Sequence, residues 1–367
     1  MTKAAELAKM GEVLTNSQIG GRRNIIINGA MQVAQRATSA TSVLASSGVI
    51  PVCDRWMFEV SNTSGRLTVS QSTDTPNGFG NSLKLDVTTA DTSVAADEFI
   101  TLVQRIEGQN LQQLKKGTSD AETVTLSFYA KGTAKRYSCG FYDVDNSRNV
   151  HAHFDVTTSW QRFIINFPAD TTGAFDNDNG NSAFILFNLH AGTNFSSGTL
   201  NTTWQSNDNT DRAAGIDSLL SSTDNELFLT GVQLEVGSQA TPFEHRSFGE
   251  ELALCQRYYQ QYDYTGTYQH FLDAQANSAN TARGIFPLIA SMRTNPTVSN
   301  NGVGNFRINA YSGGVDETCN TITINHAEET YISISFIKAT SNLTTNMNMY
   351  INTQATNDAS LYVDAEL

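Results

Sequence analysis

The stretch LFLTGVQLEVGSQATPFEHRSFGEELALCQRYYQQY, from Leu227 to Tyr262, is the most informative part of this chain. It begins with alternating apolar residues, which are typical of a β-strand, and continues through an extended connection. It ends in a segment with helical periodicity. This order predicts that a short helix over residues 247–262 joins one β-domain to a second β-domain.

The helical segment has a clear start and an apolar seam. Ser247 and Glu250 have the spacing of a capping box, in which each residue can bond to the backbone amide of the other. Five residues then recur at the a and d positions of about two heptads, namely Phe248, Leu252, Cys255, Tyr259 and Tyr262. Such a seam packs either against other copies of the chain or against the chain's own sandwich. Periodicity does not distinguish the two.

Residues 23–246, before the helix, are predicted to form an antiparallel β-sandwich. Short runs with period-two alternation, beginning with NIIING at Asn24 and including SLKLDVT at Ser82, are separated by turns rich in Asn, Asp and Gly. No helical period lies between them, which favours a sandwich over a fold of alternating strands and helices. The polar stretch from Ala191 to Ser222 is expected to be a long surface loop.

Residues 263–367, after the helix, alternate again and predict a second, smaller sandwich, with Ile332, Ile334 and Phe336 on one face. Residues 1–14 favour a helix, within a segment over residues 1–22 that either frays or docks onto a larger assembly. The predicted fold class is all-β. Two antiparallel, jelly-roll-like β-sandwich domains are joined by a short helix and preceded by a short N-terminal helix.

Charge and cysteine content exclude several classes of function. The net charge of −13 and the lack of basic clusters argue against binding to nucleic acid, because a phosphate backbone requires a basic patch. No apolar run is long enough to insert into a membrane, and the N-terminus lacks a secretory signal. The cysteines show no metal-binding spacing, which predicts buried, reduced thiols at Cys53, Cys139, Cys255 and Cys319.

The chain contains no motif of nucleophilic, phosphate-binding or metalloprotease chemistry, so we do not expect an enzyme. His151 and His153 would share one face of a strand, but no third metal ligand is fixed nearby, which favours an ordinary polar face. DNDNG, residues 176–180, resembles the start of a calcium loop. Phe187 occupies the position of the expected bidentate Glu, so a turn is favoured.

Aromatic residues in polar surroundings form the remaining group of candidate site residues. Trp204 lies in the polar loop, and Tyr264, Tyr268 and Phe271 follow the helix in YDYTGTYQHF. An exposed ring beside Asn, Asp and Gln side chains suits a sugar, which needs a stacking surface and paired hydrogen bonds. The alternative is that these rings pack in a core or at an interface between subunits.

Several segments together resemble virion proteins of tailed bacteriophages, and especially tail-fibre-type proteins of marine and cyanobacterial phages. The resemblance extends from Arg23 to about Val298, and the stretch from Leu229 to Tyr259 is its most specific part. The segments that carry it are RNIIINGAMQVAQR, DRW at Asp54, LVQRIEG, TLSFYAKG, TTSWQRF, LTGVQLEVGSQATPFEHRSFGEELALCQRYYQQY and MRTNPTV.

The resemblance implies a non-enzymatic structural protein of the virion that needs no cofactor. It implies a homotrimer that contacts other virion proteins through residues 1–22 and attaches to host surface polysaccharide through its C-terminal domain. The first sandwich would resemble a carbohydrate-binding module, in which a structural calcium ion would be held by Asn28 and Glu235. The alternatives are a capsid decoration or head-fibre protein and, from another class, a polysaccharide depolymerase.

Overall fold

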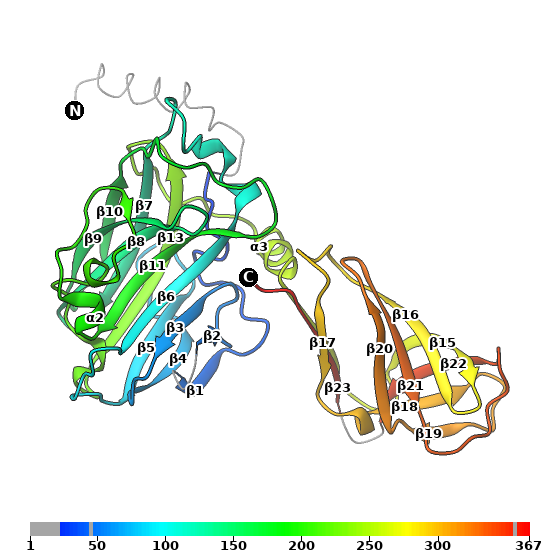
Figure 1. Cartoon of the computed structure of the whole chain (residues 1–367). Coiled ribbons are helices and arrows are strands. Elements are labelled where there is room, and N and C mark those ends of the chain that lie inside the picture. Colours follow the sequence, from blue (N-terminus) through cyan, green and yellow to red (C-terminus); the bar gives the residue numbers. More distant parts are fainter. Residues whose placement is uncertain (1–22, 44–46, 355–357) are drawn as a thin grey trace. The chain divides into compact units, whose positions relative to one another are not determined.

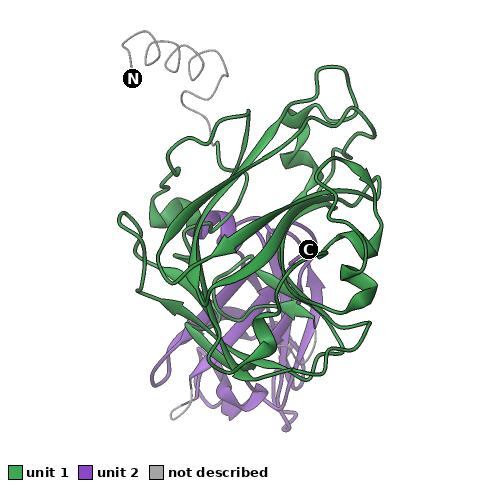
Figure 2. Ribbon diagram, turned by 90° about the vertical axis from the view of Figure 1, so that its left-hand side faces the viewer, with its two compact units in different colours: residues 1–251, 367 green, residues 252–366 purple. Residues whose placement is uncertain are grey.

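A computed structural model describes residues 23–43, 47–354 and 358–367, so the predicted N-terminal helix and docking segment lie outside the described residues. The chain divides into two compact units, residues 1–251 with Leu367 and residues 252–366 (Figures 1 and 2). The strands form four sheets, and paired strands such as β11 and β6 run antiparallel. The predicted all-β, antiparallel fold class is confirmed.

Unit 1 is a sandwich of a six-stranded and a seven-stranded sheet. The six-stranded sheet has the order β1 (Ser39–Val43), β4 (Arg66–Ser72), β5 (Ser82–Thr89), β13 (Glu226–Val236), β7 (Val124–Gly132) and β10 (Gln161–Phe167). The seven-stranded sheet has the order β12 (Gln205–Ser206), β9 (Arg148–Val156), β8 (Lys135–Asp143), β11 (Asn181–Ala191), β6 (Phe99–Glu107), β3 (Met57–Ser61) and β2 (Gly48–Val49).

Alternate side chains of both sheets fill the core of unit 1. Phe128 of one sheet meets Phe187 of the other edge to face, with ring centroids 5.1 Å apart. The first expected strand, at Asn24, is wrong because residues 26–28 form a bend. The segment still bonds to β13: Asn24 Oδ1 accepts from Leu234 N and Asn24 Nδ2 donates to Val232 O, both at 3.0 Å. The backbone N of Ile25 also donates to Leu234 O at 2.9 Å.

Unit 2 contains a three-stranded and a seven-stranded sheet around a second core. The small sheet has the order β14 (Tyr259–Tyr264), β23 (Ala359–Asp364) and β17 (Thr297–Asn300). The large sheet has the order β19 (Asp316–Thr318), β18 (Phe306–Ala310), β22 (Asn348–Thr353), β15 (His270–Ser278), β16 (Thr281–Pro287), β21 (Tyr331–Ile337) and β20 (Thr321–Ala327).

Few helical segments interrupt the strands in the described part of the chain. The α-helices are α2 (Thr193–Ser196) and α3 (Phe248–Gln256), and short 3-10 turns lie at η1 (Gly108–Asn110), η2 (Gln112–Leu114), η3 (Asn209–Asp211), η4 (Leu219–Ser221) and η5 (Val303–Asn305). None of these described helices is long and apolar enough to cross a membrane. All four cysteines are buried free thiols, as predicted.

The capping box at the start of α3 is confirmed. Glu250 Oε2 accepts from the backbone N of Ser247 at 3.0 Å, and Glu250 N donates to Ser247 Oγ at 3.3 Å. The predicted length of the helix is wrong, because α3 ends at Gln256 and Tyr259 begins β14. β14 pairs with β23 near the end of the chain, so sheet pairing replaces the helix there.

The five seam residues therefore do not form one helical stripe. Phe248 lies on α3 with 57% of its surface exposed, whereas Cys255 is fully buried. Tyr259 and Tyr262 lie on β14 and are buried, and Tyr262 belongs to the core of unit 2. The prediction of one helical seam through all five residues is therefore wrong, because Tyr259 and Tyr262 lie on a strand. Homotrimer formation stays a prediction.

Candidate functional site: an aromatic and amide face on unit 2

Trp204, in the polar loop of unit 1, packs inward. Its ring meets Phe141 edge to face at 5.4 Å, and its Nε1 donates to Pro168 O at 2.7 Å. The Lys116 ammonium lies 5.3 Å from its ring centroid. The ring and the polar edge of this indole both have partners within the chain, so the packing alternative describes Trp204 better than sugar stacking.

The three aromatic residues after the helix have different environments. Phe271 is buried in the core of unit 2, and Tyr264 is half-buried against it with ring centroids 4.9 Å apart. Tyr268 is 51% exposed and has a positive φ of 54°, which places it in a turn. Of these three, Tyr268 is therefore the one whose ring is accessible to a ligand.

Tyr268 belongs to a group of polar and aromatic side chains on the outer face of the seven-stranded sheet of unit 2. On β18 and β22 the residues Ile308 and Ile351 belong to the core, so their neighbours point outward. On β15 an irregularity between His270 and Leu272 leaves both Phe271 and Leu272 in the core, and His270 and Asp273 flank them on the outer face. We call this group the aromatic–amide face. It consists of Tyr268, His270, Asp273, Arg307, Asn309, Tyr311, Tyr350 and Asn352.

Strand register places these side chains in cross-strand rows. Tyr350 of β22 lies between Asp273 of β15 and Asn309 of β18, and Asn352 lies between His270 and Arg307. Because neighbouring strands are about 5 Å apart, side chains in one row contact one another. Figure 1 shows β15, β22 and β18 following one another in this sheet.

The rings of this face form a connected surface. Tyr311 is 61% exposed, and its ring centroid lies 4.7 Å from that of the half-buried Tyr350. His270 stacks against the same Tyr350 at 6.0 Å with an interplanar angle of 25°. The Arg307 guanidinium lies 5.9 Å from the Tyr268 ring. An aromatic surface thus borders charged donors and acceptors.

Hydrogen bonds hold the polar groups of this face in place. Tyr311 Oη donates to Asp273 Oδ1 at 2.6 Å, and this hydrogen bond to a carboxylate raises the pKa of Tyr311. Asn309 Nδ2 donates to Asn352 Oδ1 at 2.6 Å, and both residues are buried. Arg307 Nε donates to Asp316 Oδ1 at 2.7 Å, which fixes the guanidinium plane. The polar groups are therefore oriented before any ligand arrives.

Sequence reasoning missed most of this face. The alternation Asn348, Tyr350, Asn352 in one strand was an available signal, because outward-facing aromatic and amide residues repeat there with period two. The partners Asp273 and Arg307 could not be assigned in this way, because their row depends on strand order.

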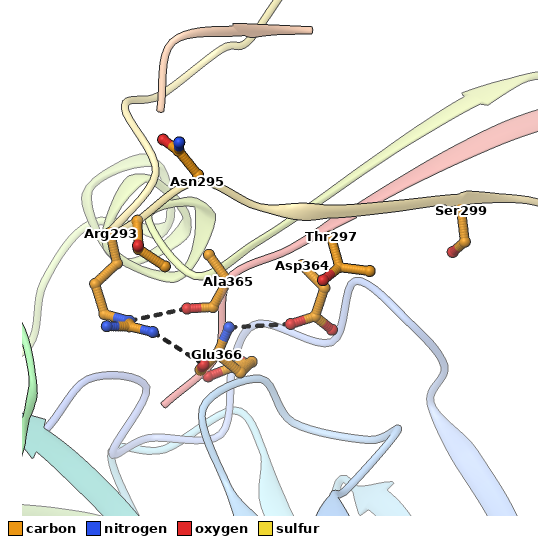
Figure 3. A pocket seen from close by; sticks show the side chains of 8 residues that line it. Arg293, Asn295, Thr297, Ser299, Asp364, Ala365 and Glu366 are labelled. Atoms are coloured by element: carbon orange, nitrogen blue, oxygen red, sulfur yellow. Dashed lines mark hydrogen bonds between the residues drawn. The ribbon is translucent and has the colours of Figure 1, made fainter. Parts of the chain in front are cut away.

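A groove elsewhere on unit 2 is a second candidate site (Figure 3). It has a volume of about 490 Å³ and is lined by Arg293, Thr294, Asn295, Thr297, Ser299, Asp364, Ala365 and Glu366. Arg293 Nε donates to Ala365 O at 2.9 Å, and Glu366 N donates to Asp364 Oδ1 at 3.0 Å (Figure 3). No aromatic ring lines this groove, so it lacks the stacking surface that the aromatic–amide face offers.

The outer face of the seven-stranded sheet of unit 1 is covered by loop 192–222. His151 Nδ1 bonds to Asn201 Oδ1 at 2.8 Å, and His153 Nε2 bonds to Ala214 O at 2.7 Å. Asn188 Nδ2 donates to Arg212 O at 2.9 Å. The histidine pair thus binds the chain's own loop.

The DNDNG segment, residues 176–180, forms a turn in which Gly180 N donates to Asp178 Oδ1 at 2.8 Å.

Asn28 and Glu235, the predicted calcium ligands, both have hydrogen-bond partners within the chain. Asn28 Oδ1 accepts from Val33 N at 2.9 Å, and both Glu235 oxygens accept from Thr241, at 2.9 and 2.7 Å. Arg246 Nη1 already donates to the nearby Ile26 O at 3.1 Å and pairs with Glu251 at 3.3 Å. Calcium binding stays a prediction from the resemblance, and the geometry adds no support to it.

No protein-family model and no curated protein matches this chain. Among solved structures, the enzymatically active domain of bacteriophage CBA120 tailspike protein 4 is 14% identical over 58% of this chain and 21% of that chain, with a TM-score of 0.31. This chain thus spans about a fifth of the length of that structure.

Two carbohydrate-binding domains give similar scores. A family 11 carbohydrate-binding module of Clostridium thermocellum is 13% identical over 55% of this chain and 97% of that chain, with a TM-score of 0.28. The N-terminal cellulose-binding domain of Cellulomonas fimi β-1,4-glucanase C is 13% identical over 57% of this chain and 100% of that chain, with a TM-score of 0.28. Likeness at these TM-scores does not establish a shared function.

Proposed function

We propose that this protein is a non-enzymatic structural protein of the virion of a tailed bacteriophage, and that it attaches to host surface glycan through the aromatic–amide face of unit 2. The observation that carries the glycan-binding part is the exposed Tyr311 ring beside Tyr350, with Asp273 and Arg307 within reach of the same surface. A pyranose ring needs this pairing of an apolar platform with oriented polar groups.

The sequence resemblance to tail-fibre-type proteins supports the virion part of the proposal. In this context the chain would be a homotrimer that docks to other virion proteins through residues 1–22. The rings of Tyr268 and Tyr311 are more than half exposed, so a single site would bind weakly. Three faces per trimer, repeated around a particle, would raise the apparent affinity through effective concentration.

The glycan-binding part is tested with the full-length protein on an array of bacterial surface glycans and on lipopolysaccharide from host cells. We expect Tyr350→Ala to lower the affinity about tenfold, equivalent to about 1.4 kcal/mol, because it removes the ring that supports both His270 and Tyr311.

Tyr331→Ala is the matched control, because Tyr331 is 38% exposed on the same sheet but lies on β21, away from the face. Circular dichroism checks that each variant is folded. Equal losses of affinity in both variants, or no glycan signal from the wild-type protein, would contradict the proposal.

The position of the protein on the particle separates attachment from capsid decoration. Immunogold labelling is expected on the tail, and antibody against unit 2 is expected to slow adsorption to cells. Labelling confined to the capsid would favour a decoration or head-fibre protein instead. Release of reducing sugar from host polysaccharide by the purified protein would contradict the non-enzymatic part.

A further inference from the structure

Three buried side chains of the types that bind metals converge in unit 1. Asp91 follows β5, Glu98 immediately precedes β6, and His190 lies on β11. A carboxylate oxygen of each acid and a ring nitrogen of His190 all lie within 4.8 Å of one another. The residues are 3%, 6% and 0% exposed, respectively, so water does not screen the two carboxylates from each other.

Hydrogen bonds from several segments hold the two acidic residues in place. Asp91 N donates to Leu220 O at 2.8 Å, and Gly192 N donates to Glu98 O at 2.7 Å. Asp91 Oδ2 accepts from Thr63 Oγ1 and from Ser64 N, both at 2.8 Å. The Asp91 carboxylate is thus oriented by neutral donors, which leave its negative charge uncompensated.

Among the described residues, the Glu98 carboxylate has no partner outside the cluster. Its one contact among the described residues is Oε2 with His190 Nε2 at 3.3 Å, and no described Lys or Arg pairs with Glu98 or Asp91. An ionised carboxylate that is taken out of water without a cation or several donors is strongly destabilised. Because two such carboxylates lie next to the same small space, a cation bound there would stabilise both.

The second nitrogen of His190 is held from outside the cluster. His190 Nδ1 lies 2.7 Å from Ser218 Oγ, which accepts from Leu220 N at 3.1 Å. When Nδ1–H donates to Ser218 Oγ, the lone pair of Nε2 faces the carboxylates. A partner that orients the non-ligating nitrogen is a regular feature of histidines that bind metals.

We propose that Asp91, Glu98 and His190 bind one divalent transition-metal ion, with Zn²⁺ as the preferred ion. One imidazole nitrogen and two carboxylates suit zinc, which takes mixed nitrogen and oxygen ligands, and a water molecule can complete its coordination. Calcium is disfavoured because it prefers sets of six to eight oxygen ligands. This site shares no residue with the aromatic–amide face and does not depend on the proposed function.

The bound metal would join segments that are distant in sequence. Asp91 and His190 also contact loop 192–222, through Leu220 O and Ser218 Oγ. The ion would therefore fasten this loop and the β5–β6 connection to the end of β11. Because such a site forms only in the folded chain, metal binding would stabilise unit 1.

The test uses the full-length protein grown in zinc-depleted or zinc-supplemented medium and purified without chelators. Elemental analysis is expected to find about one zinc ion per chain after growth with zinc. The thermal unfolding midpoint of unit 1 is expected to lie about 5 °C higher than in zinc-depleted protein. Growth with cobalt is expected to give a visible absorption band from the cobalt–imidazole site.

Glu98→Gln is the most informative variant, because it changes the unfolding midpoint in opposite directions with and without a metal site. With metal bound, the variant loses a ligand, so zinc content falls at least tenfold and the unfolding midpoint drops. Without a metal site, the same change removes an uncompensated buried charge, so the midpoint rises and metal content is unaffected. His190→Gln provides a second variant that removes the nitrogen ligand.

His151→Gln is the matched control, because His151 is equally buried on the same sheet but bonds to Asn201 rather than to carboxylates. It is expected to keep its zinc and its cobalt band. The proposal is overturned if wild-type protein grown with zinc carries no bound zinc. It is also overturned if Glu98→Gln retains the metal, or if Ca²⁺ stabilises the protein and Zn²⁺ does not.

Discussion

Tyr311 combines two properties that belong to different parts of one side chain. Its ring is 61% exposed beside Tyr350, whereas its hydroxyl is bonded to Asp273 at 2.6 Å. The ring offers a stacking surface, and the hydroxyl bond fixes the direction in which that surface points. The two contributions can be separated by substitution.

We expect Tyr311→Ala to lower glycan affinity about tenfold and Tyr311→Phe to lower it only about threefold. The phenylalanine variant keeps the ring and loses only its anchor to Asp273. Titration calorimetry with the best array glycan measures both. If the two variants lose the same affinity, the hydroxyl rather than the ring is what the glycan contacts.

His151 is a buried base whose surroundings disfavour its charged form. Burial lowers the pKa of His151 to about 4, from the usual 6.5, and the Arg212 guanidinium acts in the same direction. The unfolded chain therefore binds a proton at this residue more readily than the folded chain does. The stability that His151 contributes is complete above about pH 6.5 and is lost as the pH falls toward 4.

The free energy of unfolding of unit 1 is expected to fall by up to about 3 kcal/mol between pH 7 and pH 4 through His151, since one pKa unit corresponds to about 1.4 kcal/mol. His151→Gln should flatten this part of the pH profile in urea denaturation experiments. The exposed His326, substituted in the same way, serves as the control. An unchanged slope in His151→Gln would show that other groups carry the acid sensitivity.

At the scale of elements, loop 192–222 acts as a cover over the seven-stranded sheet of unit 1. Asn201, a polar side chain of this loop, is 5% exposed and bonds to both His151 and the Asn149 backbone. The polar composition of the loop predicts that it lies exposed on the surface. In the structure, its polar groups form hydrogen bonds with polar groups of the strands beneath it.

Asn201→Ala is expected to destabilise unit 1 by about 1–3 kcal/mol, because it leaves polar groups of His151 and Asn149 buried without partners. Urea denaturation measures the loss, and limited proteolysis should show faster cleavage within the loop. Thr202→Ala, at the exposed neighbouring position, should have little effect. Equal stability of the two variants would mean that the loop does not seal the sheet.

The segment after α3 shows how an element can change type. Tyr259 and Tyr262 continue the heptad spacing of the helix, yet they lie on β14. Tyr259 pairs there with Asp364, close to the end of the chain. Helical periodicity reflects only residues that are close in the sequence. The pairing of β14 with β23, which are far apart in the sequence, outweighs this local preference for a helix.

At the scale of the whole molecule, the described residues form one main hydrophobic core in each unit, and unit 1 has in addition a small cluster of Val103, Phe184 and Leu186. The core of unit 1 includes Phe128 and Phe187, and that of unit 2 includes Phe306 and Phe336. No described residue belongs to both cores. Substitutions in the two cores should therefore act on separate parts of the chain.

Phe336→Ala is expected to destabilise unit 2 by about 3–5 kcal/mol, because it removes a fully buried ring and leaves a cavity. Peptide-resolved hydrogen exchange should show lost protection in residues 252–366 and unchanged protection in unit 1. Phe128→Ala should show the reverse pattern. Loss of protection throughout the chain in either variant would mean that the two units unfold together.

The sequence by itself determined the all-β class, the strands with period-two alternation, the capping box at Ser247 and Glu250, and the buried thiols. These features depend on residues close together in the chain, where side-chain direction follows from local backbone geometry. Tertiary structure alone decided that Phe271 is buried and Trp204 packs against the core of unit 1, while Tyr311 is exposed. It also decided which strands place Asp273, Arg307 and Tyr350 together. Exposure and cross-strand neighbours depend on strand order and register, which long-range packing sets.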